Sequence, residues 1–175
     1  MTQAVTPSQT IGPFSHEAWQ WACAVCASAP DGLDAITIEG VLLDGDGAPI
    51  TDGMIEAWTS AAATVEQERE HPLAGFRRVP TGDDGGFTLA LSRGQEAAAE
   101  PAALVTVFTR GLLVHQFTAV FLEDDDLERA ALLKQVPAER RATLVARKTG
   151  PASYAWEIRM QGERETVFFD YGGAP

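Results

Sequence analysis

The sequence predicts an all-β fold: an antiparallel β-sandwich with an extended N-terminal arm, long loops and one or two short helices. Short stretches rich in β-branched and aromatic residues recur along the chain, and glycine- and aspartate-rich turn signals separate them at regular intervals. This pattern is typical of sandwiches. The clearest pair lies within residues 101–122, where two such stretches flank Thr109-Arg110-Gly111, and the glycine can take the positive φ that a turn needs.

The other elements follow in chain order. The first strand should cover residues 36–43, with Ile36, Ile38 and Val41 facing inward, and it ends at an Asp-Gly-Asp-Gly turn that lacks the ligand spacing of a calcium loop. Further strands are expected at 54–58, 76–79, 87–91, 142–148, 154–160 and 165–169. Residues 81–86 look like a hairpin loop, and residues 127–135 look like a short helix that follows a solvated acidic turn.

Length and charge limit the function. A chain of 175 residues fits one domain, which we divide into an arm with a short helical segment (1–35) and the sandwich (36–175). A net charge of −12 argues against nucleic-acid binding, because such proteins need a positive surface. No apolar run has the length that spans a bilayer, and the N-terminus lacks the basic and apolar regions of a signal peptide. We therefore expect a cytoplasmic protein that does not bind membranes.

Residues able to carry chemistry are sparse. Cys23 and Cys26 have redox-like spacing but follow no strand, and two cysteines do not complete a zinc site, so we interpret them as small apolar residues. The three histidines are far apart, and His115 falls on an apolar face where a core histidine is expected. The chain contains no nucleophile-elbow, P-loop or zincin motif.

Arg110 is the exception, because it is one charge framed by apolar sequence. Burying a lone charge is costly, so this guanidinium requires an anionic partner. Two partners are open at this point: a structural carboxylate of the chain itself, or an anionic ligand at the mouth of a site.

Three segments carry a resemblance to a known family. They are TPSQTIGPF at residues 6–14, EGVLLDGDGAPITDGMIEAW with FTRG at 39–58 and 108–111, and IRMQGERETVFF at 158–169. Together they resemble the α subunits of the protocatechuate 3,4-dioxygenase family, which are intradiol ring-cleaving enzymes. The resemblance touches both ends and the middle of the chain, and it implies the same β-sandwich.

The resemblance also implies where iron is bound. Catalytic subunits of the family hold Fe(III) with two tyrosines and two histidines, and the histidine positions are occupied here by Ala102 and Leu104. The tyrosine positions fall near residues 65–66 and 95–97, where this chain has no tyrosine. Alanine and leucine offer no lone pair to a metal. We therefore expect the iron in a partner β subunit and none in this chain.

The role implied for this chain is to complete the partner's substrate pocket. Protocatechuate carries a carboxylate, and a guanidinium offers a fixed fork of donors to an anion. The expected function is that of the α subunit in a higher (αβ)n assembly that converts 3,4-dihydroxybenzoate and O2 to 3-carboxy-cis,cis-muconate. Phe14 departs from the family, which commonly has tyrosine there. The residues that the resemblance places at the pocket are Thr10, Ile11, Gly12, Pro13 and Arg110.

Two other functions are compatible with the sequence. The first is a stand-alone β-sandwich that binds carbohydrate or protein, although the four tryptophans form no obvious stripe. The second is a purely architectural subunit without a pocket role. The effect of replacing Arg110 on substrate affinity separates the second alternative from the expected function.

Overall fold

The computed structural model describes residues 24, 26–27, 35–59, 66–68, 70, 73–92 and 99–171, and these residues form a β-rich fold. Within them, the helices α4 (Ala131–Lys134) and η2 (Ala138–Leu144, a 3-10 helix) are short, and none has the length or apolar character needed to cross a membrane. The strands are β1 (Ala35–Leu43), β2 (Met54–Trp58), β3 (Phe76–Pro80), β4 (Gly86–Ser92), β5 (Ala103–Phe108), β6 (Gln116–Leu122), β7 (Val145–Gly150) and β8 (Ser153–Arg159).

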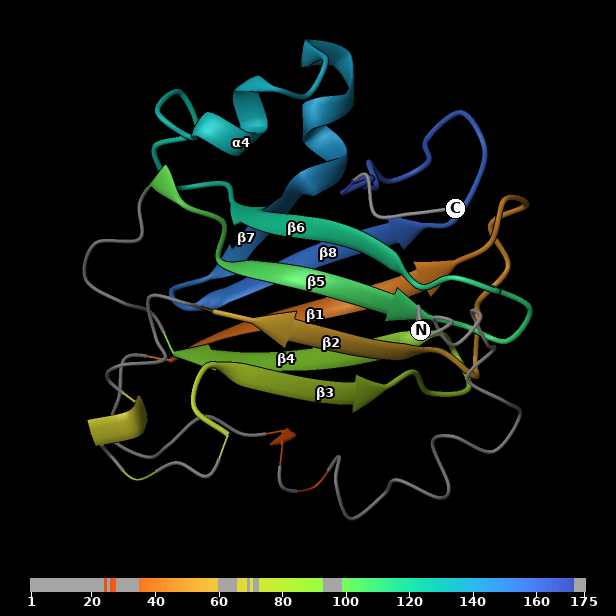
Figure 1. Cartoon of the computed structure of the whole chain (residues 1–175), viewed down its shortest axis with the longest axis horizontal. Coiled ribbons are helices and arrows are strands. Elements are labelled where there is room, and N and C mark those ends of the chain that lie inside the picture. Colours follow the sequence, from red (N-terminus) through yellow and green to blue (C-terminus); the bar gives the residue numbers. More distant parts are fainter. Residues whose placement is uncertain are drawn as a thin grey trace, which may run out of the picture.

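The strands form one curved, near-barrel sheet of eight strands in the order β3-β2-β5-β6-β7-β8-β1-β4. Its two halves face each other, and in Figure 1 strands β2 and β5 lie in front of β1. Among the described strands, β6 and β7 provide the ladder that joins the halves, by the two parallel residue pairs Phe121↔Val145 and Leu122↔Ala146. The all-β prediction is confirmed. The architecture is less purely antiparallel than a simple sandwich, because β1 and β8 also run parallel.

The core lies between the two halves. Strand side chains alternate between the two faces of a sheet, so each half sends every second residue inward. Tyr154, Trp156 and Ile158 of β8 share the inward face, as the sequence predicts. The core residues contributed by the facing half of the sheet include Ile55, Ala57, Val79, Ala103, Val105, Val107, Val120 and Leu122.

One predicted inward side chain of β1 is wrong. Ile36 and Ile38 are buried as expected, but Val41 faces outward and Leu42 is fully buried. The alternation passes through Gly40, at an inward position where an added Cβ would lie only 2.1 Å from Phe87 Cζ. Gly40 therefore leaves room for the Phe87 ring, and the sequence pattern hides this inward position because glycine is not apolar.

Residues 81–86 do not close a hairpin, contrary to the prediction. β3 pairs with β2, and β4 pairs with β1, so this loop crosses from one half of the molecule to the other. Thr81 starts the crossing, because its N–H donates to Gly53 O at 3.0 Å and its Oγ1 accepts from Gly53 N–H at 2.8 Å. These bonds fix the turn before β2 against the end of β3.

The C-terminal third deviates from the prediction in three places. The predicted helix at 127–135 is reduced to α4, and η2 occupies the first residues of the strand predicted at 142–148. The predicted strand at 165–169 is replaced by a single bridge between Phe117 and Phe169. The predicted division at residue 36 stays a prediction, because most of the arm lies outside the described residues.

Candidate functional site

The outward face of β2 and β5 carries an exposed apolar pair where β2 ends and β5 begins. Trp58 and Leu104 are direct neighbours in the β2–β5 register, and their exposed fractions are 53% and 44%. The Trp58 ring packs against Phe76 of β3, with ring centroids 4.6 Å apart. An apolar run such as that of β5 predicts a strand covered on both faces, but Leu104 is exposed. The described residues therefore leave this end of the outer face open, although Met54 and Thr106 on the same face are buried.

The residues that we expect at the family's histidine positions, Ala102 and Leu104, do not suit a metal. Leu104 points outward, whereas Ala102 is partly buried against the core and donates its N–H to Val120 O at 2.7 Å. Glu66 lies at one of the tyrosine positions, but its carboxylate is engaged by Arg77. Within the described ranges no three His, Cys, Asp or Glu residues come together as a metal site would require.

Arg110 lies at the end of β5 and forms an ion pair with Asp52, whose carboxylate precedes β2. Arg110 Nε is 2.9 Å from Asp52 Oδ2. The arginine side chain is nevertheless 68% exposed, while that of Asp52 is 22% exposed. The structural carboxylate considered from the sequence therefore exists, and it leaves most of the guanidinium open to solvent.

Arg110 belongs to the same face of the sheet as Leu104. In the β2–β5 register Trp58 is opposite Leu104 and Met54 is opposite Phe108. Continuing this register by two residues on each strand sets Asp52 opposite Arg110. Because side chains alternate with a period of two, these pairs share the outward face. The ion pair and the apolar patch are thus two ends of one surface.

The tip of the β5–β6 hairpin extends this surface. Gly111 has a φ of +93°, and Leu113 and Val114 are 68% and 50% exposed. His115 is exposed, so the expected core histidine is wrong; its ring packs between Phe108 and Phe117, with centroid distances of 5.3 and 4.6 Å. The period-two alternation of a strand does not apply to His115, because β6 begins only at Gln116.

The other predicted pocket residues belong to the N-terminal arm. Thr10, Ile11, Gly12 and Pro13 lie outside the described residues, as does Cys23. Cys26 is a buried free thiol, and burial raises its pKa. A thiol with a raised pKa is poorly ionised and unreactive, which agrees with the interpretation of Cys26 as a small apolar residue.

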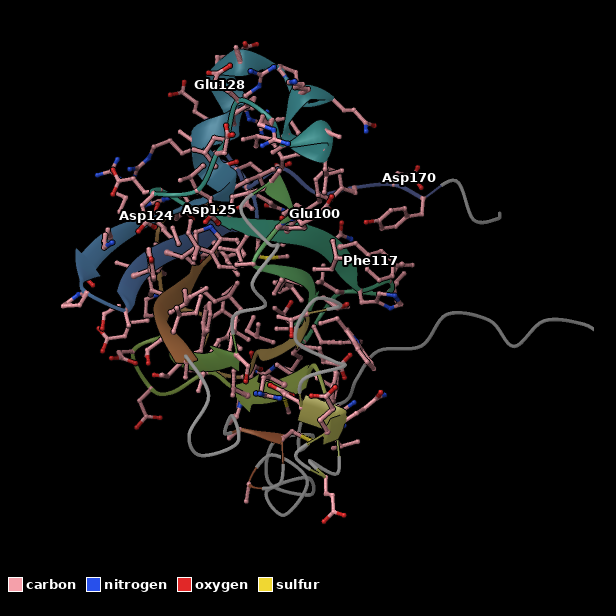
Figure 2. All side chains as sticks on the ribbon, turned by 90° about the vertical axis from the view of Figure 1, so that its left-hand side faces the viewer. Glu100, Phe117, Asp124, Asp125, Glu128 and Asp170 are labelled. Carbon is pink, nitrogen blue, oxygen red and sulfur yellow. The ribbon has the colours of Figure 1, made fainter. Side chains whose placement is uncertain are left out.

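The acidic turn after β6 has partners within the fold. Asp124 accepts hydrogen bonds from Lys148 Nζ at 2.5 Å and from Tyr154 Oη–H at 2.8 Å, and the Lys148 bond in particular lowers its pKa. Figure 2 shows Asp124 on the opposite side of the molecule from Phe117. This cluster ties the turn to β7 and β8 and lies away from the apolar face.

A groove of about 690 Å³ lies on the other half of the sheet. It runs between η2 and the outward faces of β1, β7 and β8. Its lining carries charges of both signs, from Arg140, Arg147 and Arg164 and from Glu39, Glu139, Glu157 and Glu163. Mixed charges of this kind do not select an anionic or a cationic small molecule.

Comparisons with known proteins agree on one family. No family model matches the chain. The chain is 36% identical over 191 residues to the protocatechuate 3,4-dioxygenase alpha chain of Burkholderia cepacia, with 94% of this chain and 96% of the relative covered. It is 30% identical over 197 residues to the alpha chain of the same name from Pseudomonas putida, with 95% and 96% covered.

Solved structures share the fold at low sequence identity. The dioxygenase domain of a dioxygenase and carbohydrate-binding protein fusion from Streptomyces sp. SirexAA-E matches with a TM-score of 0.55 and 16% identity, covering 78% of this chain and 87% of that one. Catechol 1,2-dioxygenase from Acinetobacter sp. ADP1 matches with a TM-score of 0.54 and 14% identity, covering 76% and 55%. These likenesses concern the arrangement of the strands.

Proposed function

Because the chain belongs to the family of protocatechuate 3,4-dioxygenase alpha chains and is an intradiol dioxygenase subunit, we propose that it is the iron-free partner in a heteromeric enzyme. The holoenzyme converts 3,4-dihydroxybenzoate and O2 to 3-carboxy-cis,cis-muconate. A catalytic β subunit holds the Fe(III), which binds the catecholate and activates it towards O2. The present chain contributes part of the pocket wall and the contacts of a higher (αβ)n assembly in the cytoplasm.

The iron-free role is supported by the side chains at the ligand positions. Ala102 and Leu104 have no donor atom, and the Glu66 carboxylate is already bound by Arg77. These residues do not fit an iron ion, so no step of the chemistry is assigned to them. The contribution of this chain to the reaction is to bind and orient the substrate.

The exposure of Arg110 carries the proposed pocket role. Its guanidinium lies just beyond the end of β5, whereas Leu104, at a position where we expect the family to have a metal ligand, lies near the start of the same strand. A planar guanidinium recognises a carboxylate with two parallel hydrogen bonds, and protocatechuate differs from catechol by one carboxylate. Arg110 therefore binds the substrate carboxylate across the interface, and the backbone of Thr10, Ile11, Gly12 and Pro13 lines the same entrance.

The apolar face supports a partner subunit as the occupant of this surface. Trp58, Leu104, Leu113 and Val114 are each at least 44% exposed, and they lie on the outward side of β2 and β5 or at the hairpin tip. Large exposed apolar patches mark protein–protein contacts. The relatives are named alpha chains, which supports a second, different subunit as the partner.

Co-expression with an iron-binding intradiol subunit tests the proposal. We expect a coloured complex that cleaves protocatechuate, and an Arg110→Ala complex whose KM for protocatechuate rises on the order of tenfold or more, as expected for a lost charge-assisted pair. An intact Arg110→Ala complex with unchanged KM would support the architectural alternative. A soluble, inert monomer that ignores the partner would support the binding-module alternative.

A further inference from the structure

We propose that Asp52 is a positioning residue for Arg110, and that it makes the enzyme selective for catechols that carry a carboxylate. The inference rests on the proposed function, in which Arg110 meets the substrate. Asp52 does not contact the substrate itself. It holds one edge of the guanidinium so that the other edge faces the ligand.

The first observation is the place of Asp52 in the sheet. Met54 is opposite Phe108 in the β2–β5 register, and Asp52 and Arg110 lie two residues beyond this pair, in the turns before β2 and after β5. Cross-strand neighbours on one face lie within reach of each other's side chains. The 2.9 Å contact between Arg110 Nε and Asp52 Oδ2 is therefore set by the pairing of β2 with β5.

The second observation is that the backbone beside Asp52 is fixed. Gly53 N–H donates to Thr81 Oγ1 at 2.8 Å, and Gly53 O accepts from Thr81 N–H at 3.0 Å. A side chain added at Gly53 would meet Leu42 Cδ2 at 2.6 Å, so the turn packs directly on the core. A carboxylate on such a turn is a fixed anchor, and the arginine on the hairpin tip is the more exposed partner of the pair.

The third observation is that the contact is incomplete. Asp52 Oδ2 is buried, and it accepts no hydrogen bond from the described residues, although Arg110 Nε is 2.9 Å away. The N–H of Nε is therefore not directed at this oxygen. A buried acceptor without a hydrogen bond is unfavourable, and a small rotation of the guanidinium satisfies it. Because the guanidinium is planar, fixing Nε against Asp52 also fixes the direction in which the terminal nitrogens of Arg110 point.

The chemistry of arginine divides these roles. The guanidinium has five N–H donors, one on Nε and four on the terminal nitrogens. Asp52 engages Nε and leaves the terminal pair, on a side chain that is 68% exposed, for a second carboxylate. Fixing the fork in advance reduces the ordering cost of binding. This arrangement favours a catecholic acid over a catechol without the acid group.

The test uses the complete complex with the Asp52→Asn subunit and compares protocatechuate with catechol. We expect the protocatechuate KM to rise on the order of tenfold, the worth of about one charge-assisted hydrogen bond, while the KM for catechol changes less than about twofold. Asp52→Glu, which keeps the charge, should recover part of the loss. Asp83→Asn removes one exposed charge elsewhere and is the matched control, with an unchanged KM for both substrates.

A second variant covers the case in which Asp52→Asn impairs assembly. Arg110→Lys keeps the charge at an exposed position but has no Nε edge for Asp52 to hold. We expect it to raise the protocatechuate KM to a similar extent as Asp52→Asn. An Arg110→Lys complex with wild-type KM overturns the positioning role, and it also contradicts two-bond recognition of the substrate carboxylate by the guanidinium.

The outcomes separate this inference from the proposed function. If Arg110→Ala leaves the protocatechuate KM unchanged, Arg110 does not bind the substrate and the proposed pocket role fails. If Arg110→Ala raises KM but Asp52→Asn does not, only the positioning role of Asp52 fails. An Asp52→Asn variant that weakens both substrates equally marks Asp52 as merely structural. In the Arg110→Ala background, Asp52→Asn should have no further effect.

Discussion

Glu66 and Arg77 form an ion pair whose side chains are 0% and 1% exposed. The remaining hydrogen-bonding groups of the pair are also satisfied. Glu66 accepts from Gly75 N–H at 2.6 Å and from Ser92 Oγ–H at 2.5 Å, and Arg77 Nε donates to Ala90 O at 2.7 Å. The pair thereby links β3, and the segment that precedes it, to β4. These two strands are the edge strands of the near-barrel sheet.

Breaking this pair should strongly destabilise the chain. Arg77→Met leaves the Glu66 carboxylate buried without its counter-charge, and such losses cost about 3–5 kcal/mol. Arg78→Met on the same strand is the matched control, because Arg78 and Glu56 are 27% and 15% exposed. The carboxylate left behind keeps some access to water there, so the loss of stability should be smaller. Urea unfolding of the complex measures both. An equal decrease in the free energy of unfolding for the two variants would contradict the prediction that the buried pair contributes more to stability.

Stability should fall in acid because of Glu66. Burial alone raises the pKa of Glu66, but hydrogen bonds from Arg77, Ser92 and Gly75 outweigh it, so its pKa lies below the ordinary value of 4.5. A carboxyl with a lowered pKa stabilises the folded state above its ordinary pKa and loses this contribution as the pH falls through the folded value. The free energy of unfolding should therefore decline below about pH 4.5. Glu66→Gln should be less stable at neutral pH and show a shallower acid decline.

The sequence was most informative where apolar alternation is unbroken. Tyr154, Trp156 and Ile158 face inward as predicted, and β2 has the predicted bounds. At Gly40 the apolar pattern is interrupted, because this inward glycine accommodates the Phe87 ring of another strand and is not itself apolar. Pairing partners are equally hidden: nothing local to residues 81–86 indicates that β3 and β4 join opposite halves.

The sequence identified one residue of the candidate site, but not the residue that pairs with it. Arg110 stands out in the sequence because it is a charge among apolar residues, but its partner Asp52 is far away in the chain and comes near only through the β2–β5 register. The Glu66–Arg77 pair was missed for the same reason, since residues 59–75 are polar and show no periodicity. Contacts between distant segments depend on strand order, which local patterns do not encode.

A charge at the hairpin tip should weaken assembly. Leu113 is 68% exposed, and an aspartate there would bury an unpaired charge if the partner subunit covers the tip. We expect Leu113→Asp to weaken the complex at least about tenfold, measured by sedimentation or light scattering over a dilution series. Thr88→Asp, an exposed position on β4, is the control and should leave assembly unchanged. Normal assembly of the Leu113 variant would show that the partner subunit does not cover this tip.

Iron should remain bound to the partner subunit when the two chains are separated. Metal analysis after separation under mild conditions should find the iron with the partner and less than about a tenth of an equivalent with this chain, because structural sites need about four donors and Ala102 and Leu104 supply none. Reloading the isolated chain with iron should give no purple or red chromophore. Stoichiometric iron in the isolated chain would contradict the assignment of metal-free status.

Because β1 pairs with β8 in parallel, the sheet around β1 is completed only after the last strand has formed. Ile38 pairs with Tyr154, so a strand near the start of the fold completes its ladder only with the last strand. Contacts between residues so far apart in the chain slow folding. While the chain is being synthesised, β1 has β4 on one side and an unpaired edge on the other, and such edges promote aggregation. A chain truncated before β8 should therefore depend on chaperones, even though most of its strands are present.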